Sequence, residues 1–275
     1  DGSIDAIIGF WDFPVSPLVP VLAERYGTTA PSTISVLKCE QKYWSRLEQK
    51  QAVPDHIPAF QCVDPRDPDA DRKIELSYPF WLKPVVAFGG QYAFLVHNDA
   101  ECRRDLGIIR EHIAKFAEPF DSLLRQIDMP STAPDLTGYS CVAEDGLHGR
   151  QCTLSGHVHD GEVQAYGVVD SLYYDRAHSF FCYRYPSTLP ATVCERMERV
   201  SVDFLSHIGY DNSPFNIEFF WDEESDRVSL LEVNSRISQS HSFLYHQVDG
   251  ASNHQVLVEC ALGEQPHFPH RQGPN

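Results

Sequence analysis

Acidic and amide side chains recur at regular spacing in residues 216–236. The apolar runs Asn216–Trp221 and Val228–Asn234 flank the polar segment DEESDR. This pattern predicts an antiparallel hairpin that turns within the polar segment. Glu218 and Glu232 then lie opposite each other on one face of the hairpin, with their Cβ atoms about 5 Å apart.

Asn234 extends this face because it lies two residues beyond Glu232 on the same strand. Two carboxylates that converge in an apolar hairpin repel each other and need a compensating cation. Mg²⁺ takes one or two protein carboxylates and completes its shell with water and substrate phosphates, and Mn²⁺ accepts the same kind of ligand. Arg236 follows on the same side, with a guanidinium group that matches a phosphate. The alternative is a sheet packed on one side only, whose acidic side chains face water.

The composition limits the kinds of protein and partner. The 275 residues are 42% hydrophobic, enough to bury a core in one large or two smaller domains. The formal net charge of −17 argues against nucleic acids and anionic membranes as partners. No apolar run approaches the roughly 20 residues of a membrane span, so we expect a cytoplasmic protein. The eight cysteines lack a CxxC motif, and we interpret them as buried thiols rather than disulfides.

Residues 33–51 are expected to form one helix with a basic side chain at every fourth position. These side chains are Lys38, Lys42, Arg46 and Lys50. Such a row is typical of a solvated helix face. The whole chain contains only six lysines, however, so three in one segment set it apart.

Lys83 interrupts the hydrophobic run Tyr78–Val86, which we expect to form a strand. A lysine in an otherwise buried strand is costly unless it meets an anion, so Lys83 is a candidate anion ligand. The alternative is an edge strand that carries a lysine against aggregation. Gly89 and Gly90 follow in a short loop, where glycines let backbone N–H groups approach a phosphate or simply form a hairpin turn.

The other expected elements are assigned from periodicity and from turn residues. Strands are expected at 4–10, 59–63, 92–97, 139–144, 151–158, 163–173 and 179–185. Helices are expected at 17–26, 99–116, 190–208 and 253–262. The second of these helices would break at Pro119 and continue to residue 127, and the third would follow an N-cap at Thr188. The segment 238–246 reads as a polar loop, in which Ser240 and His241 are candidates for substrate contacts. Residues 266–275 are expected to be disordered.

From Val36 to Gly263 the chain resembles the ATP-grasp superfamily. The resemblance rests on the hairpin residues 216–218 and 232–236, on Lys42, and on Lys83. It implies an α+β fold, with two α+β lobes that bind ATP between antiparallel sheets. It also implies that Glu218, Glu232 and Asn234 are the magnesium ligands, and that Arg236 holds a phosphate or the reacting carboxylate. Lys42 and Lys83 match the two phosphate-binding lysines.

Further nucleotide contacts are implied by the same resemblance. Ala143, Glu144 and Leu147 lie where the family presents backbone groups to the adenine. Gln151 stands near the place of the family's ribose-binding acid, and Arg184 is a candidate for a further phosphate contact. Gly89 and Gly90 would form the flap over the γ-phosphate.

The resemblance divides the chain and suggests a reaction. Residues 1–35 would be a remnant of a preceding α/β domain, 36–138 the N-terminal lobe, 139–263 the C-terminal lobe with the metal site, and 264–275 a tail. The implied function is an ATP-dependent ligase that activates a carboxylate as an acyl phosphate and transfers it to an amine, as in amino-acid or dipeptide ligases. A bicarbonate-activating, carboxylase-type enzyme and a non-catalytic ATP-binding regulator are the alternatives. The expected partners are ATP and small carboxylate and amine substrates, with a homodimer left open.

Overall fold

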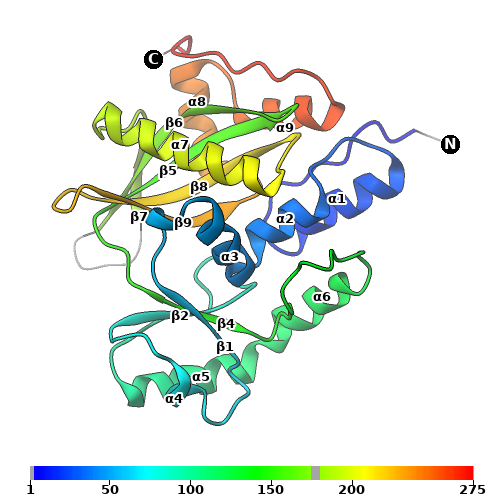
Figure 1. The fold of residues 1–275 in the computed structure, drawn as a ribbon. Coiled ribbons are helices and arrows are strands. Elements are labelled where there is room, and N and C mark those ends of the chain that lie inside the picture. The colour runs from blue at the N-terminus through cyan, green and yellow to red at the C-terminus, as the bar shows by residue number, and fades with distance from the viewer. Residues whose placement is uncertain (1–2, 175–179, 275) are drawn as a thin grey trace.

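The computed structural model describes residues 3–174 and 180–274, which form two antiparallel sheets with helices packed around them (Figure 1). One sheet has four strands in the order β1-β4-β2-β3, and the other has five in the order β7-β6-β5-β8-β9. The expected α+β architecture with two lobes is therefore confirmed. None of the described helices has the length and the apolar content needed to cross a membrane.

The smaller sheet is covered by helices that lie between its third and fourth strands in sequence. Its elements are β1 (Phe60–Val63), α4 (Ala70–Lys73), β2 (Phe80–Pro84), β3 (Phe94–Val96), α5 (Asp99–His112), α6 (Ala114–Leu124) and β4 (Cys141–Asp145). Leu106 and Ile109 of α5 pack against Phe80 and Leu82 of β2 in one buried cluster. Because β4 lies in the middle of this sheet, the chain passes to the other sheet after Asp145, and not at the boundary expected at 138/139.

The larger sheet is covered on both faces. Its elements are β5 (Arg150–His159), β6 (Glu162–Tyr173), β7 (Phe180–Arg184), α7 (Ala191–Ile208), β8 (Ser213–Asp222), β9 (Arg227–Asn234), η2 (Gln239–His241), α8 (Ser242–Asp249) and α9 (Asn253–Leu262). Adjacent residues of β6 point to opposite faces, so Val168 joins the core under α7 while Val169 joins the core under α8 and α9. Figure 1 shows α7 across one face of the sheet and α8 with α9 beyond the other.

Several local predictions are corrected by the structure. Residues 4–10 form no strand and pair with neither of the described sheets. Ile4 and Ile8 of this apolar run are about half exposed. The helix expected from residue 99 ends near Ile113, and Pro119 lies inside α6. Thr188 does not cap α7; its backbone N–H and its hydroxyl donate to Asp170 instead.

The C-terminal region is more ordered than its composition indicates. The segment interpreted as a polar loop contains α8, whose buried Tyr245 anchors it to the sheet. The tail expected to be disordered packs against the same core, where Phe268 stacks on Tyr166 with ring centroids 3.8 Å apart. Both misassignments have one cause, because isolated aromatic residues among polar ones give no periodic signal. All eight cysteines are free thiols, and five of them are buried, as expected.

The helix expected at 33–51 is two helices, α2 (Thr33–Glu40) and α3 (Lys42–Ala52), which follow α1 (Val15–Tyr26) and precede η1 (Pro54–His56). The break falls at Gln41, whose side-chain oxygen accepts a hydrogen bond from the backbone N–H of Trp44 at 2.6 Å and so caps α3. Figure 1 shows α3 between the two sheets. Its position buries Arg46 and partly buries Lys42, whereas Lys50 of the same row stays exposed.

Arg46 of α3 joins the two sheets. Its Nε donates to the Glu144 carboxylate in β4 at 2.9 Å, and its terminal nitrogens donate to the carbonyls of Leu230 and Leu231 in β9 at 3.0 and 2.8 Å. The Arg46 side chain is 4% exposed and that of Glu144 is 5% exposed. A guanidinium group is well suited to this position because its fixed donors can reach several acceptors at once.

We expect Arg46→Met to lower the free energy of unfolding by about 3–5 kcal/mol, because it removes one partner of a buried ion pair and leaves two strand carbonyls unsatisfied. The measurement is urea unfolding at neutral pH. Lys50→Met on the exposed side of the same helix is the matched control, with an expected change within about 0.5 kcal/mol. Equal effects of the two substitutions would contradict the role of Arg46 between the sheets.

Candidate functional site

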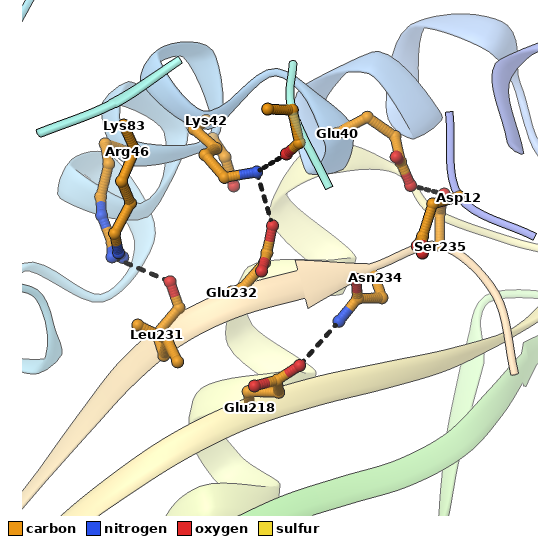
Figure 2. A network of polar contacts seen from close by, with 12 residues as sticks. Asp12, Glu40, Lys42, Arg46, Lys83, Glu218, Leu231, Glu232, Asn234 and Ser235 are labelled. Carbon is orange, nitrogen blue, oxygen red and sulfur yellow. Dashed lines mark hydrogen bonds and ion pairs between the residues drawn. The ribbon is translucent and has the colours of Figure 1, made fainter. Parts of the chain in front are cut away.

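The acidic hairpin forms with the predicted register. Glu218 of β8 pairs with Glu232 of β9, and Asn216 pairs with Asn234 two residues away. A bulge follows directly after Glu218, a feature that redirects side chains near functional sites. Figure 2 shows Glu232 directed toward Lys42 and Asn234 directed toward Glu218. The hairpin therefore presents two carboxylates and an amide to one space.

The two carboxylates are in different electrostatic environments. Partial burial raises the pKa of Glu218 to about 7, and the like negative charge of Glu232 on the facing strand adds to this effect. Gln151 donates to Glu218 at 2.8 Å. Burial alone would raise the pKa of Glu232, but the Lys42 ammonium, 2.8 Å from its carboxylate, lowers it. Lys42 thus pairs with one acid, whereas Glu218 has no ion pair among the described residues and feels only the more distant charge of Arg236.

This donor set fits a divalent cation that prefers oxygen ligands. Among the described residues, no group of three or more His, Cys, Asp and Glu side chains is placed to hold a metal ion. Glu218, Glu232 and the Asn234 amide oxygen would hold such an ion, with water and phosphate oxygens at the other positions. That division of ligands is typical of Mg²⁺.

The two predicted lysines reach the site from different elements. Lys42 begins α3 and also donates to the Ala87 carbonyl at 2.8 Å. Lys83 of β2 donates to the Glu144 carboxylate. Burial alone would raise the pKa of Glu144, but the Arg46 and Lys83 cations lower it to about 2. Glu144 is thus an ionised partner of two cations at neutral pH.

Three cavities follow one another along the groove between the lobes. The first, of about 130 Å³, is lined by Lys83, Glu144 and Leu231. It shares Lys42 and Glu232 with a second cavity of about 260 Å³. The third, of about 400 Å³, shares its lining residues Asp12, Phe180, Glu218 and Arg236 with the second. Together the three form a continuous path past the acidic hairpin.

The glycine loop borders the first two cavities. Gly89 and Gly90 have φ angles of +61° and +69°, and no atom lies within 4 Å of the position that a Cβ would take at either residue. No other described part of the chain therefore crowds these two positions. Its left-handed conformation explains why glycine occupies both positions.

Arg236 lies at the junction of the second and third cavities. Its guanidinium pairs with the Asp12 carboxylate and donates to the Asn234 side-chain oxygen at 3.2 Å. Asp12 was not a sequence candidate, because it stands alone in the N-terminal segment. Glu40 was also missed; it accepts a hydrogen bond from Ser235 at 2.7 Å, and burial raises its pKa.

The remaining predicted site residues lie farther from the acidic hairpin or have other partners. Ala143 is fully buried in β4, and Leu147 lies just beyond that strand. Gln151 contacts Glu218 and accepts a hydrogen bond from Tyr173, so it stands beside the predicted metal site. Arg184 of β7 pairs with Asp170 at 2.7 Å. The nucleotide contacts assigned to these residues stay predictions. Ser240 and His241 both line the third cavity.

Arg46 is the site residue that sequence reasoning undervalued. It lines the first cavity beside Lys83 and Glu144. Its spacing of four from Lys42 indicated a solvated row. No local signal in the sequence distinguishes Arg46, because Lys83 and Glu144 on neighbouring strands already balance each other's charge.

Comparisons with known proteins agree with this architecture. The family model for the ATP binding domain of the carbamoyl-phosphate synthase L chain matches residues 184–265. The C-terminal section of the carbamoyl phosphate synthase large chain from Methanopyrus kandleri is 23% identical over 244 residues, which cover 86% of this chain and 39% of that protein.

Solved structures give the same fold over most of the chain. The L-amino acid ligase from Bacillus licheniformis superposes with a TM-score of 0.72 at 17% identity, over 94% of this chain and 56% of that one. The biotin carboxylase domain of the 2-oxoglutarate carboxylase from Hydrogenobacter thermophilus gives a TM-score of 0.72 at 19% identity, over 92% and 52%. The chain thus spans about half the length of these proteins. The two sheets and these superpositions show that the chain has the ATP-grasp fold, and its residues 184–265 match the model of an ATP binding domain.

Proposed function

We propose that the chain carries the ATP-binding site of a ligase that activates a carboxylate as an acyl phosphate and joins it to an amine. The observation that carries this proposal is the opposed pair Glu218 and Glu232, which face two lysines and an arginine along a continuous groove. Relatives support it: an L-amino acid ligase shares the fold, and the structure of the 2-oxoglutarate carboxylase domain contains MgADP.

ATP would lie along the groove, with its adenine in the first cavity and its phosphates beside Lys42 and Lys83. Both ammonium groups are already near the groove, and ligand phosphates would replace the carboxylates that hold them now. The backbone of the Gly89–Gly90 loop would cover the phosphates. Mg²⁺, held by Glu218, Glu232 and Asn234, would neutralise charge on the phosphate oxygens.

The reaction needs positioning and charge stabilisation more than a protein nucleophile. A carboxylate oxygen of the substrate attacks the γ-phosphorus, and the bond to the β-phosphate oxygen breaks to release ADP. The amine nitrogen then attacks the acyl carbon, loses a proton and displaces inorganic phosphate. Arg236 would orient the carboxylate, since it lies where the phosphate and substrate cavities meet.

Bicarbonate activation is the second candidate function. It is favoured by the family-model match to carbamoyl-phosphate synthase and by the bicarbonate in the 2-oxoglutarate carboxylase structure. Release of ADP and phosphate separates the candidates: the ligase requires both a carboxylic acid and an amine for full turnover, whereas the second enzyme responds to bicarbonate alone. Binding of ATP without phosphate release, even in a single turnover, would instead identify a regulator.

Glu232→Gln is expected to reduce ATP turnover on the order of 100-fold and to raise the Mg²⁺ concentration needed for half-maximal activity, because one anionic ligand is lost. Stability should change by at most about 1 kcal/mol, since the partly exposed ion pair with Lys42 is lost while repulsion from Glu218 is relieved. Steady-state kinetics with Mg²⁺ titration and urea unfolding measure both effects. Glu223→Gln in the exposed hairpin loop is the control; parental activity in both variants would refute the metal assignment.

Lys83→Ala is expected to raise the KM for ATP about tenfold or more, because a cation is lost beside the phosphates. The measurement is the ATP dependence of ADP release at saturating Mg²⁺. Lys73→Ala, which removes a lysine whose side chain is 64% exposed, should leave the KM unchanged. An unaltered KM for Lys83→Ala would place the triphosphate elsewhere.

A further inference from the structure

The third cavity lies at the far end of the groove and has the size of a small-molecule site. Its volume of about 400 Å³ is at the lower end of the range for ligand pockets. It reaches the acidic hairpin through Glu218. A molecule in this cavity would therefore lie next to the place where phosphoryl transfer is proposed.

The charged groups of this cavity form one cation–anion pair besides the hairpin acid. Arg236 is the cationic side chain among its described lining residues, because burial, with a smaller effect of Arg236, lowers the pKa of His241 to about 4 and leaves that ring neutral at neutral pH. Asp12 is the remaining anion, with its carboxylate bound to the Arg236 guanidinium. Both side chains keep partial access to solvent, at 18% for Arg236 and 26% for Asp12.

Apolar rings form the rest of the wall. Phe10, Trp11, Phe180 and Tyr183 line the cavity. Trp11 is 56% exposed and Phe180 is 41% exposed, so each ring has surface that a ligand could cover. Tyr183 packs edge-on against His241, with centroids 4.8 Å apart. The cavity thus combines one bound pair of opposite charges with aromatic surface.

We propose that this cavity binds a zwitterionic amino acid as the carboxylate substrate, with its carboxylate on Arg236 and its ammonium on Asp12. The proposal rests on the ligase function above and specifies its substrate class. The Asp12–Arg236 pair opens to receive the zwitterion, so that one internal ion pair is replaced by two charge-assisted contacts and no net charge is buried. The carboxylate then lies beside Asn234 and Glu218, where the metal and the γ-phosphate are proposed to meet.

Smaller or singly charged carboxylates would make fewer of the contacts that this cavity offers. A carboxylate without an ammonium group would take Arg236 from Asp12 and leave the Asp12 anion without its partner in a cavity that also contains Glu218. Bicarbonate has the same deficit and leaves the aromatic wall uncovered. The amino group of the substrate is therefore the feature that Asp12 selects.

The experiment compares two ligands that differ only in that amino group. Calorimetry first measures MgADP binding to the full chain, and then titrates the MgADP-loaded protein with L-phenylalanine or with 3-phenylpropionate. We expect L-phenylalanine to bind at least about tenfold more tightly, as a charge-assisted contact implies. The MgADP titration reports on the nucleotide site of the proposed function, and the ligand pair reports on this inference.

Asp12→Asn separates direct recognition from an effect through Arg236. If Asp12 binds the ammonium, Asn weakens L-phenylalanine binding about tenfold or more and leaves 3-phenylpropionate binding equal or tighter, so that the preference disappears. If Asp12 only orients Arg236, both ligands weaken together and the preference remains. Asp12→Glu should restore part of the preference. Asp55→Asn, in the exposed η1 segment, is the matched control and should behave as the parent.

Three results would overturn the proposal. They are equal binding of the two ligands to the parent protein, an unchanged preference in Asp12→Asn, and no L-phenylalanine binding at millimolar concentration to protein that binds MgADP. Thermal unfolding without ligands accompanies each variant. An Asp12→Asn protein that unfolds at the parental temperature and loses the preference supports the proposal, because a folding defect would weaken both ligands.

Discussion

The pairing of β8 with β9 is the constraint on which the site depends. Main-chain hydrogen bonds fix the register, so Glu218 and Glu232 are held opposite each other although their charges repel. The neighbouring groups reduce this cost without removing it: Lys42 pairs with one acid, while Gln151 and Asn234 donate to the other. The repulsion that remains is what the proposed cation would relieve.

The proposed site also requires that the two lobes keep a fixed position relative to each other. Arg46 provides it, because one buried guanidinium bonds an acid of the smaller sheet and two carbonyls of the larger sheet. The same acid, Glu144, receives Lys83. The groups that hold the lobes together are thus continuous with the groups proposed to receive the nucleotide, so the shape of the first cavity follows from the packing of α3.

The sequence predicts the hairpin well because alternation of side chains and a polar turn are local signals. Glu218 and Glu232 could be paired from spacing alone, and the ATP-grasp resemblance supplied the lobes. Arg46 could not be recognised, because a row of basic residues looks the same on a solvated helix and on a helix inserted between sheets. The break at Gln41 depends on one side-chain cap, and the ordering of the tail depends on one ring, Phe268, that reaches a distant core. Such tertiary contacts leave no periodic pattern.

Lys42 has a consequence for how the two lobes respond to a ligand. Its ammonium holds the Ala87 carbonyl, at the start of the glycine loop, and the Glu232 carboxylate of the opposite lobe, while its backbone N–H donates to Val85. An anion that recruits this ammonium competes with both acceptors at once. If a phosphate recruits Lys42 as proposed, the Ala87 carbonyl and the Glu232 carboxylate would lose the same partner in one exchange.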